Sequence, residues 1–341
     1  MNAPTPGPFR STQGWHVPNP LPPKPHPRTS GPTSHPAAAP WKPGVIPLRP
    51  LSLVDIFNGS VGYVRANPGP TLGLTTAVVL TTTVLGFLGM LAAASSDSTV
   101  QSVAGIAIGV LATILAATLL SGMLTTIVAR SVLGSPITVT EAWQRVRGRL
   151  AALIVLTMLE IASATALIGL AALTVVAVAR AAGGRIATLV GAPLVLLLIC
   201  ALTYLATALA LAPVAIVLER RNVADAIRRS LALTRRRFWR TLAVLVLAGV
   251  VMAVVTGAVS LPFDVAASVV SFNARPRTSG IVEPMVATMG QAVGQIITAP
   301  FIAGVVTLLY VDARIRLEAF DFTLLRVPAG ATGTDELWLG H

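Results

Sequence analysis

The sequence predicts an all-α integral membrane protein with six transmembrane helices. Its 341 residues are 54% hydrophobic and only 11% charged, whereas a soluble domain carries about 25% charged residues. The apolar residues gather into six stretches, each long enough for the roughly 20 residues that a helix needs to cross a bilayer. The basic residues lie between these stretches and not within them. Lipid must therefore solvate much of the chain.

The first part of the chain is rich in proline. Residues 1–50 hold 15 of the 25 prolines, and such a segment favours an extended conformation and buries too little surface to fold. It has no apolar run long enough for a signal peptide. We therefore expect a disordered cytoplasmic tail. The stretch from Pro22 to Pro27 is a candidate docking site for a protein partner with an aromatic groove, although a solvated tether is the simpler interpretation.

The membrane domain is expected over residues 51–312. Strands of a membrane barrel would alternate apolar and polar residues, and these stretches do not, so each is interpreted as a helix. Glu160 and Asp264 are the only charges inside them. Prolines 193, 213, 262 and 300 predict kinks. The stretches run at about 69–96, 98–129, 150–179, 186–218, 241–274 and 284–311.

The distribution of basic residues predicts the orientation. The N-terminal segment, the loops 130–149 and 219–240 and the C-terminal tail lie on one side of the spans. Together they hold 21 of the 25 Lys and Arg residues, whereas the three segments on the other side hold 4. By the positive-inside rule, the side with more basic residues is cytoplasmic. Both termini, the loops 130–149 and 219–240, and a C-terminal tail over 313–341 are thus expected in the cytoplasm of a multi-pass cell-membrane protein.

Related polar segments precede the first, third and fifth spans. Each places a capping residue three positions before an acid, which is the pattern of a helix N-terminus. We therefore predict three repeats, over about 50–129, 137–218 and 222–312, each built from a short interfacial amphipathic helix and a helical hairpin. The pairs of capping residue and acid are Ser52 with Asp55, Thr138 with Glu141, and Asn222 with Asp225.

The densest basic cluster lies in the 219–240 loop. Next to an anionic leaflet each arginine contributes about 1 kcal/mol of binding. Because the cluster borders apolar spans, membrane lipid is the expected partner and nucleic acid is not. The alternative is that these residues only determine topology. The candidate contacts for lipid headgroups are Arg228, Arg229, Arg235, Arg236, Arg237 and Arg240.

Glu160 is the candidate functional residue inside the membrane. A carboxylate at that depth costs several kcal/mol unless it is protonated, paired or in a wet cavity, and such residues are often functional. The alternative is a protonated structural side chain bonded to a neighbouring helix, for example to the stripe of Gln291 and Gln295. Glycine pairs four residues apart, Gly105 with Gly109 and Gly290 with Gly294, allow helices to approach closely.

No catalytic constellation is found in the sequence. Cys200 is the only cysteine, and the four histidines lie in the terminal tails. No phosphate-binding loop, zinc-protease motif or nucleophile elbow is present. We expect no catalytic, cofactor or metal site, and hence no enzyme. The oligomeric state is left open.

Two segments carry a resemblance to a known family. The run Pro47-Leu-Arg-Pro50-Leu-Ser-Leu and the run from Tyr310 through Asp312, Arg314, Arg316 and Glu318 to Asp321 resemble actinobacterial proteins with a "glycerophosphoryl diester phosphodiesterase membrane domain". The resemblance covers roughly residues 44–325; family members often have Gly where Ala319 stands. It implies a membrane architecture of uncharacterised role. It does not imply phosphodiesterase activity, because the chain has no room for a catalytic barrel of about 250 residues.

The leading expectation is a non-enzymatic membrane protein that scaffolds or handles lipids in cell-envelope processes. One alternative is a transporter or permease that uses Glu160, because transporters often contain repeats and interrupted helices. Another is the membrane subunit of a partner enzyme. The surroundings of Glu160 discriminate between the first two, since a polar cavity favours transport and an apolar contact favours a scaffold.

Overall fold

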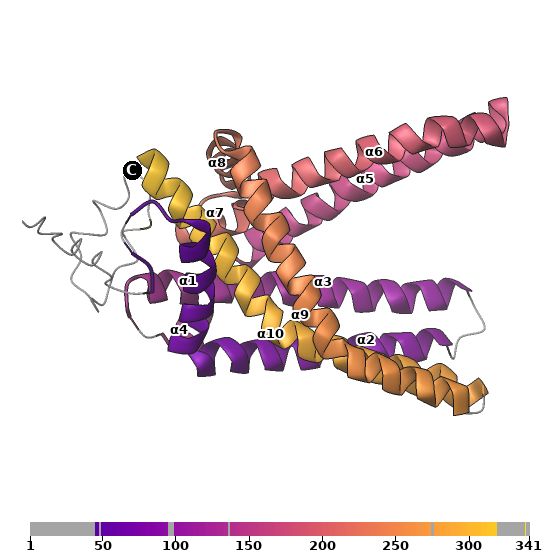
Figure 1. The fold of residues 1–341 in the computed structure, drawn as a ribbon, viewed down its shortest axis with the longest axis horizontal. Coiled ribbons are helices and arrows are strands. Elements are labelled where there is room, and N and C mark those ends of the chain that lie inside the picture. Colours follow the sequence, from indigo (N-terminus) through magenta and orange to yellow (C-terminus); the bar gives the residue numbers. More distant parts are fainter. Residues whose placement is uncertain are drawn as a thin grey trace, which may run out of the picture. The chain divides into compact units, whose positions relative to one another are not determined.

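A computed structural model describes residues 45–47, 49–94, 99–135, 137–273, 276–318 and 338 (Figure 1). The chain divides into two units, Met1–Ala39 and Pro40–His341, and the described residues all belong to the second. These residues form α-helices and one π-helical segment, and they contain no strand. The expected disordered tail over 1–50 and most of the expected tail over 313–341 lie outside the described residues.

Six helical segments are long and apolar enough to cross a membrane, which confirms the predicted spans. The fourth span consists of two helices, because residues 210 and 211 interrupt it just before Pro213. Pro193, Pro262 and Pro300 lie inside continuous helices. The helices of the spans are α2 (Leu74–Ala94, preceded by the π-helix η1, Gly69–Gly73), α3 (Thr99–Val132), α5 (Leu150–Ala182), α6 (Gly184–Leu209) with α7 (Ala212–Leu218), α9 (Phe238–Asn273) and α10 (Pro276–Glu318).

Consecutive spans pack as hairpins: α2 against α3, α5 against α6, and α9 against α10 (Figure 1). Glycines let two of these pairs approach closely. A methyl group on Gly290 would lie 2.7 Å from Cβ of Phe263, and one on Gly294 would lie 2.7 Å from Cγ2 of Thr256. In the first hairpin, a methyl group on Gly109 would lie 3.8 Å from the backbone of Gly86. The predicted role in close packing is confirmed for Gly290 and Gly294, whereas the distance at Gly109 is that of an ordinary van der Waals contact.

Three short helices precede the hairpins: α1 (Leu53–Ala66), α4 (Val139–Arg147) and α8 (Val223–Arg235). The first two begin with the predicted capping box, in which the side chain of Ser52 or Thr138 accepts a bond from the backbone of the acid three residues on. The third does not. Asn222 makes no side-chain cap, and the Asp225 carboxylate lies 3.6 Å from Arg228 instead.

The buried core lies where the short helices meet the ends of α3, α7 and α10. It includes Ile56 of α1, Ile127 of α3, Ile216 of α7 and Val311 of α10. By contrast, no residue of α5 beyond Leu156 is buried. Lipid must cover those apolar side chains in the membrane. The three predicted repeats do not appear as an evident repeat architecture, and they remain a prediction.

Candidate functional site

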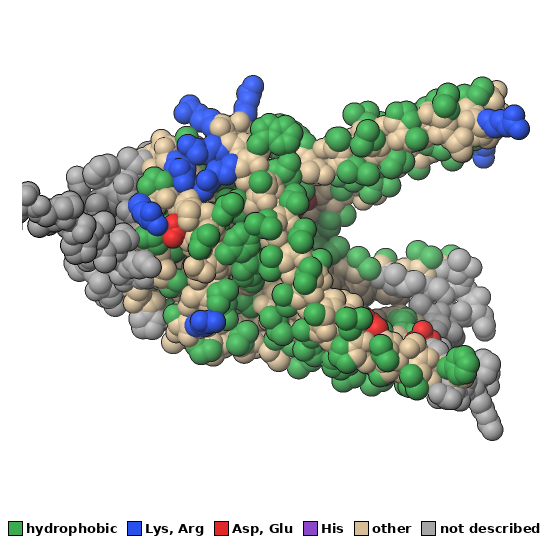
Figure 2. Space-filling model, viewed as in Figure 1, with side chains coloured by type: hydrophobic (Ala, Val, Ile, Leu, Met, Phe, Trp, Pro, Cys, Tyr) green, Lys and Arg blue, Asp and Glu red, His purple; other side chains and the backbone are tan. Residues whose placement is uncertain are grey.

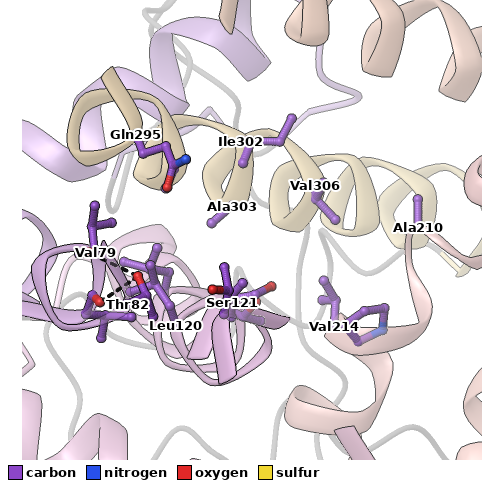
Figure 3. Close-up of a pocket in the computed structure, with 17 residues that line it drawn as sticks. Val79, Thr82, Leu120, Ser121, Ala210, Val214, Gln295, Ile302, Ala303 and Val306 are labelled. Carbon is purple, nitrogen blue, oxygen red and sulfur yellow. Dashed lines mark hydrogen bonds between the residues drawn. The ribbon is translucent and has the colours of Figure 1, made fainter. Parts of the chain in front are cut away.

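A cavity of about 320 Å³ lies among the membrane spans, between α2, α3, α10 and the α6–α7 junction (Figure 3). Its walls are mainly aliphatic, and a volume near 300 Å³ is at the lower end for small-molecule sites. Ala303 and Ile302 form one wall and Leu120 lies opposite (Figure 3). The cavity therefore offers mostly apolar surface in the middle of the spans.

The three threonine hydroxyl groups around this cavity are already satisfied by their own helices. Thr82 donates to the carbonyl of Val78 at 3.0 Å, Thr113 to that of Gly109 at 2.9 Å, and Thr125 to that of Ser121 at 2.8 Å. These bonds leave little polarity for a ligand. Gln295 is different, because its amide points from α10 toward α2 and α3 (Figure 3) and has no hydrogen-bond partner among the described residues.

A charged cluster closes one end of α7 and α10. Its centre is Glu219, whose side chain is 0% exposed. The carboxylate accepts bonds from Arg221 at 2.5 Å, from Arg229 at 3.0 Å and from the Tyr310 hydroxyl, and Arg314 lies 3.8 Å away. These five residues and Glu318, which bonds both Arg229 and Arg314, are the Glu219 cluster. Arg314 also donates to the carbonyl of the buried Trp338 at 3.2 Å.

The cluster keeps Glu219 ionised. Burial by itself would raise the pKa of the Glu219 carboxyl, but hydrogen bonds from Tyr310 and Arg221 and the charge of Arg229 outweigh this effect. The pKa is therefore lowered from its ordinary value. A buried carboxylate with this many hydrogen bonds is typical of a residue that holds helices together. Removing any one partner would leave another buried polar group unpaired.

A second cluster, around Asp312, ties the start of α1 to α9 and α10. Asp312 accepts from the backbone N–H of Leu51 at 2.8 Å, from Arg240 at 3.0 Å and from Arg316 at 2.7 Å. Both arginines also donate to the Leu51 carbonyl at 2.7 Å. The segment before the first helix is thus held by charged groups about 190 and 260 residues further along the chain.

The six arginines predicted to contact headgroups have different environments. Arg229 and Arg240 are half-buried in the Glu219 and Asp312 clusters, so their first partners are within the protein. The other four, Arg228, Arg235, Arg236 and Arg237, are exposed, and Figure 2 shows basic side chains gathered over α8 and the start of α9. Lipid contact by the six remains a prediction.

Aromatic side chains border this basic surface. The rings of Tyr204 and Phe238 lie 5.4 Å apart, and that of Trp239 lies 5.6 Å from Phe238. Trp239 is 79% exposed. Aromatic rings beside arginines are typical of a membrane–water interface.

Glu160 lies on α5, one turn beyond Thr157. The Thr157 hydroxyl is 3.0 Å from that of Thr118 on α3, so Glu160 sits next to the contact between these helices. The Glu160 side chain is half-buried and has no hydrogen bond or ion pair within the described part of the chain. It is not among the residues that line the cavity of Figure 3. The proposed partners Gln291 and Gln295 are exposed, and no bond joins them to Glu160.

The sequence analysis did not identify Glu219, Tyr310 or Asp312 as members of buried polar clusters. The available signal was that two acids stand directly at the ends of apolar spans, each followed within four residues by two arginines. Among the described residues, no group of three or more His, Cys, Asp or Glu side chains is arranged to hold a metal ion.

Comparison with protein families finds a family model that matches the chain. No curated protein and no solved structure matches the chain. The family that matches is one of unknown function, in agreement with the expected uncharacterised role, but its description differs from that of the family that the end segments resemble. The chain has six candidate membrane spans, and the model of the family described as "Domain of unknown function (DUF7847)" matches its residues 51–313, so the chain belongs to this family.

Proposed function

We propose that this protein is a non-enzymatic, lipid-handling component of the cytoplasmic membrane, with both termini in the cytoplasm. The observation that carries the proposal is the apolar cavity between α2, α3, α10 and the α6–α7 junction. Lipid is the solvent around these spans, so an acyl chain is the occupant whose chemistry matches the walls. The exposed arginines of α8 and of the link to α9 would hold anionic headgroups at the cytoplasmic surface.

The finer organisation belongs to the same proposal. In support of three repeats, each short helix packs against the second arm of a hairpin: α4 against α3, α8 against α7, and α1 against α10. Kinship with the glycerophosphoryl diester phosphodiesterase membrane domain, and a protein partner for the proline-rich tail, also remain proposals. A scaffolding role would use the same tail and the same basic surface.

The transporter alternative has less support. It needs Glu160 in a polar cavity, but the cavity between the spans is apolar and Glu160 does not line it. The hypothesis of a partner enzyme rests on no specific contact. A lipid-handling role accounts for more of the observed surface than either alternative.

Filling the cavity tests the proposal. Ala299 is a half-buried cavity residue, and Ala299→Phe would occupy the space that an acyl chain needs. The full chain is purified in mild detergent and its tightly bound lipid is quantified by mass spectrometry. We expect several-fold less lipid per protein than in the parent at a similar thermal midpoint.

Ala177→Phe is the matched control, because Ala177 is exposed on α5 and lines no part of this cavity. It should leave the bound lipid unchanged. If Ala299→Phe keeps the parent's lipid, or if both variants lose it equally, the cavity does not hold lipid and the proposed function loses its basis.

A further inference from the structure

The geometry points to a binding site for a phosphate group between α4, the α4–α5 turn and the α7–α8 link. None of the six arginines predicted to contact headgroups lines this site, although Arg220 belongs to the same 219–240 segment. A polar cavity of about 560 Å³ opens there, lined by Glu141, Gln144, Arg145, Gly148, Arg149 and Arg220. The inference deepens the proposed function by naming a headgroup chemistry, and it rests on that function only where the phosphate belongs to a lipid.

The charge balance of this cavity favours an anion. Three arginines line it against one acid. Glu141 is already engaged, since its carboxylate accepts from the Thr138 backbone at 3.4 Å, and Arg145 also has a partner, so the cations available to a ligand are Arg149 and Arg220. The side chains of Arg149 and Arg220 have no hydrogen bond or ion pair within residues that the structure describes. Guanidinium groups match the oxygens of a phosphate with paired hydrogen bonds. A bound phosphate would supply the acceptors that these side chains lack.

The backbone at Arg220 is a second and independent observation. Arg220 has φ of +54°, and it is the one non-glycine residue with positive φ in the described ranges. This left-handed conformation is unfavourable for residues with a Cβ atom, and such strain often marks functional sites. Its two neighbours, Glu219 and Arg221, bond each other, whereas Arg220 lines the cavity. A glycine would adopt this backbone without strain, so the arginine side chain itself is what the position supplies.

The surroundings fit a lipid headgroup. On α4, Trp143 is 40% exposed and Val139 is 38% exposed, as expected for a helix at a membrane–water interface. Arg145 and Arg220 also line a second, smaller cavity, together with Arg130 and the buried Trp338. The volume of the 560 Å³ cavity is within the range of small-molecule sites, so this cavity can hold a glycerophosphate group as well as free phosphate.

The test uses the full chain and the double variant Arg149→Gln/Arg220→Gln. Native mass spectrometry measures retention of phosphatidylglycerol from an equimolar mixture with phosphatidylcholine, and a thermal shift measures stabilisation by inorganic phosphate. We expect binding to weaken by about 25-fold, taking about fivefold for each arginine. Retained phosphatidylglycerol unaffected by inorganic phosphate would identify a lipid site. Displacement by inorganic phosphate, with stabilisation of lipid-free protein, would identify a site for the free ion.

Two further variants separate binding from folding and from net charge. Arg180→Gln/Arg185→Gln removes the same charge at the α5–α6 turn and should bind like the parent. Arg220→Gly removes the side chain and the backbone strain together, so its thermal midpoint should equal or exceed that of the parent while binding falls. If the site variants bind like the parent, or if the Arg180/Arg185 pair loses as much, the site is refuted. The proposed function would still stand if Ala299→Phe had lost its lipid.

Discussion

At the scale of single residues, the buried acids Glu219 and Asp312 connect parts of the chain that are distant in sequence. Glu219 joins the end of α7 to α8 and α10, and Asp312 joins α10 to the segment before α1 and to α9. Each acid accepts bonds from at least two arginines. Removing one partner of a buried ion pair leaves an uncompensated charge, which is more costly than the absence of the whole pair.

We therefore predict that Glu219→Ala lowers the free energy of unfolding by about 3–5 kcal/mol, because Arg229 and Tyr310 lose their buried acceptor. Denaturation of the full chain in detergent measures the change. Asp225→Ala is the control, since the pair of Asp225 with Arg228 is exposed and is expected to contribute less than about 1 kcal/mol. Equal losses in the two variants would show that burial of Glu219 contributes nothing.

The pH dependence gives the same prediction a second readout. Because the folded pKa of Glu219 is lowered, its stabilisation is complete above the unfolded value of about 4.3. It is lost as the pH falls through the folded value. The stability of the parent should therefore fall more steeply below about pH 4 than that of Glu219→Gln, which does not titrate. Parallel acid limbs would contradict this assignment.

At the scale of elements, the α5–α6 hairpin depends on one residue of its turn. Gly183 alone separates the two helices and has φ of +85° and ψ of 166°, a region that is essentially accessible only to glycine. Apart from its chain neighbours, no residue has an atom within 4 Å of a methyl group placed there. The requirement for glycine at this position is therefore conformational and not steric.

Gly183→Ala should destabilise the protein by about 1–3 kcal/mol through backbone strain. The adjacent Gly184→Ala is the control. Gly184 begins α6 with open space around it, so alanine should be neutral or stabilise by up to about 1 kcal/mol. The denaturation midpoint should therefore fall for Gly183→Ala and stay the same or rise for Gly184→Ala. A neutral Gly183→Ala would mean that the hairpin tolerates another turn.

At the scale of the whole molecule, six spans require that successive connecting segments alternate between the two sides of the membrane. Reporter fusions at residues 31, 97, 147, 184, 229, 278 and 333 should read inside and outside in turn, beginning and ending inside, because the basic segments remain cytoplasmic. Two neighbouring fusions that report the same side would remove a span. Full alternation that begins outside would keep the spans and overturn the orientation.

The features that the sequence by itself determined are local. Long uncharged stretches predicted six spans because the bilayer thickness sets the length of a crossing helix. The caps at Ser52 and Thr138 were predictable because a capping box involves residues three positions apart. The same rule was wrong for Asn222, where the Asp225 carboxylate pairs with Arg228 and the cap bond is not made.

Only the tertiary structure decided which polar groups meet. Hydropathy shows that a helix crosses the membrane but not which helices are its neighbours. It therefore could not show that Glu219 bonds a tyrosine 91 positions away, or that Arg229 and Arg240 are held inside while Arg235 is exposed. Nor could it show that Glu160 lies off the apolar cavity. The strength of a charge–charge interaction depends on distance and burial, and both are set by the packing of the helices against one another.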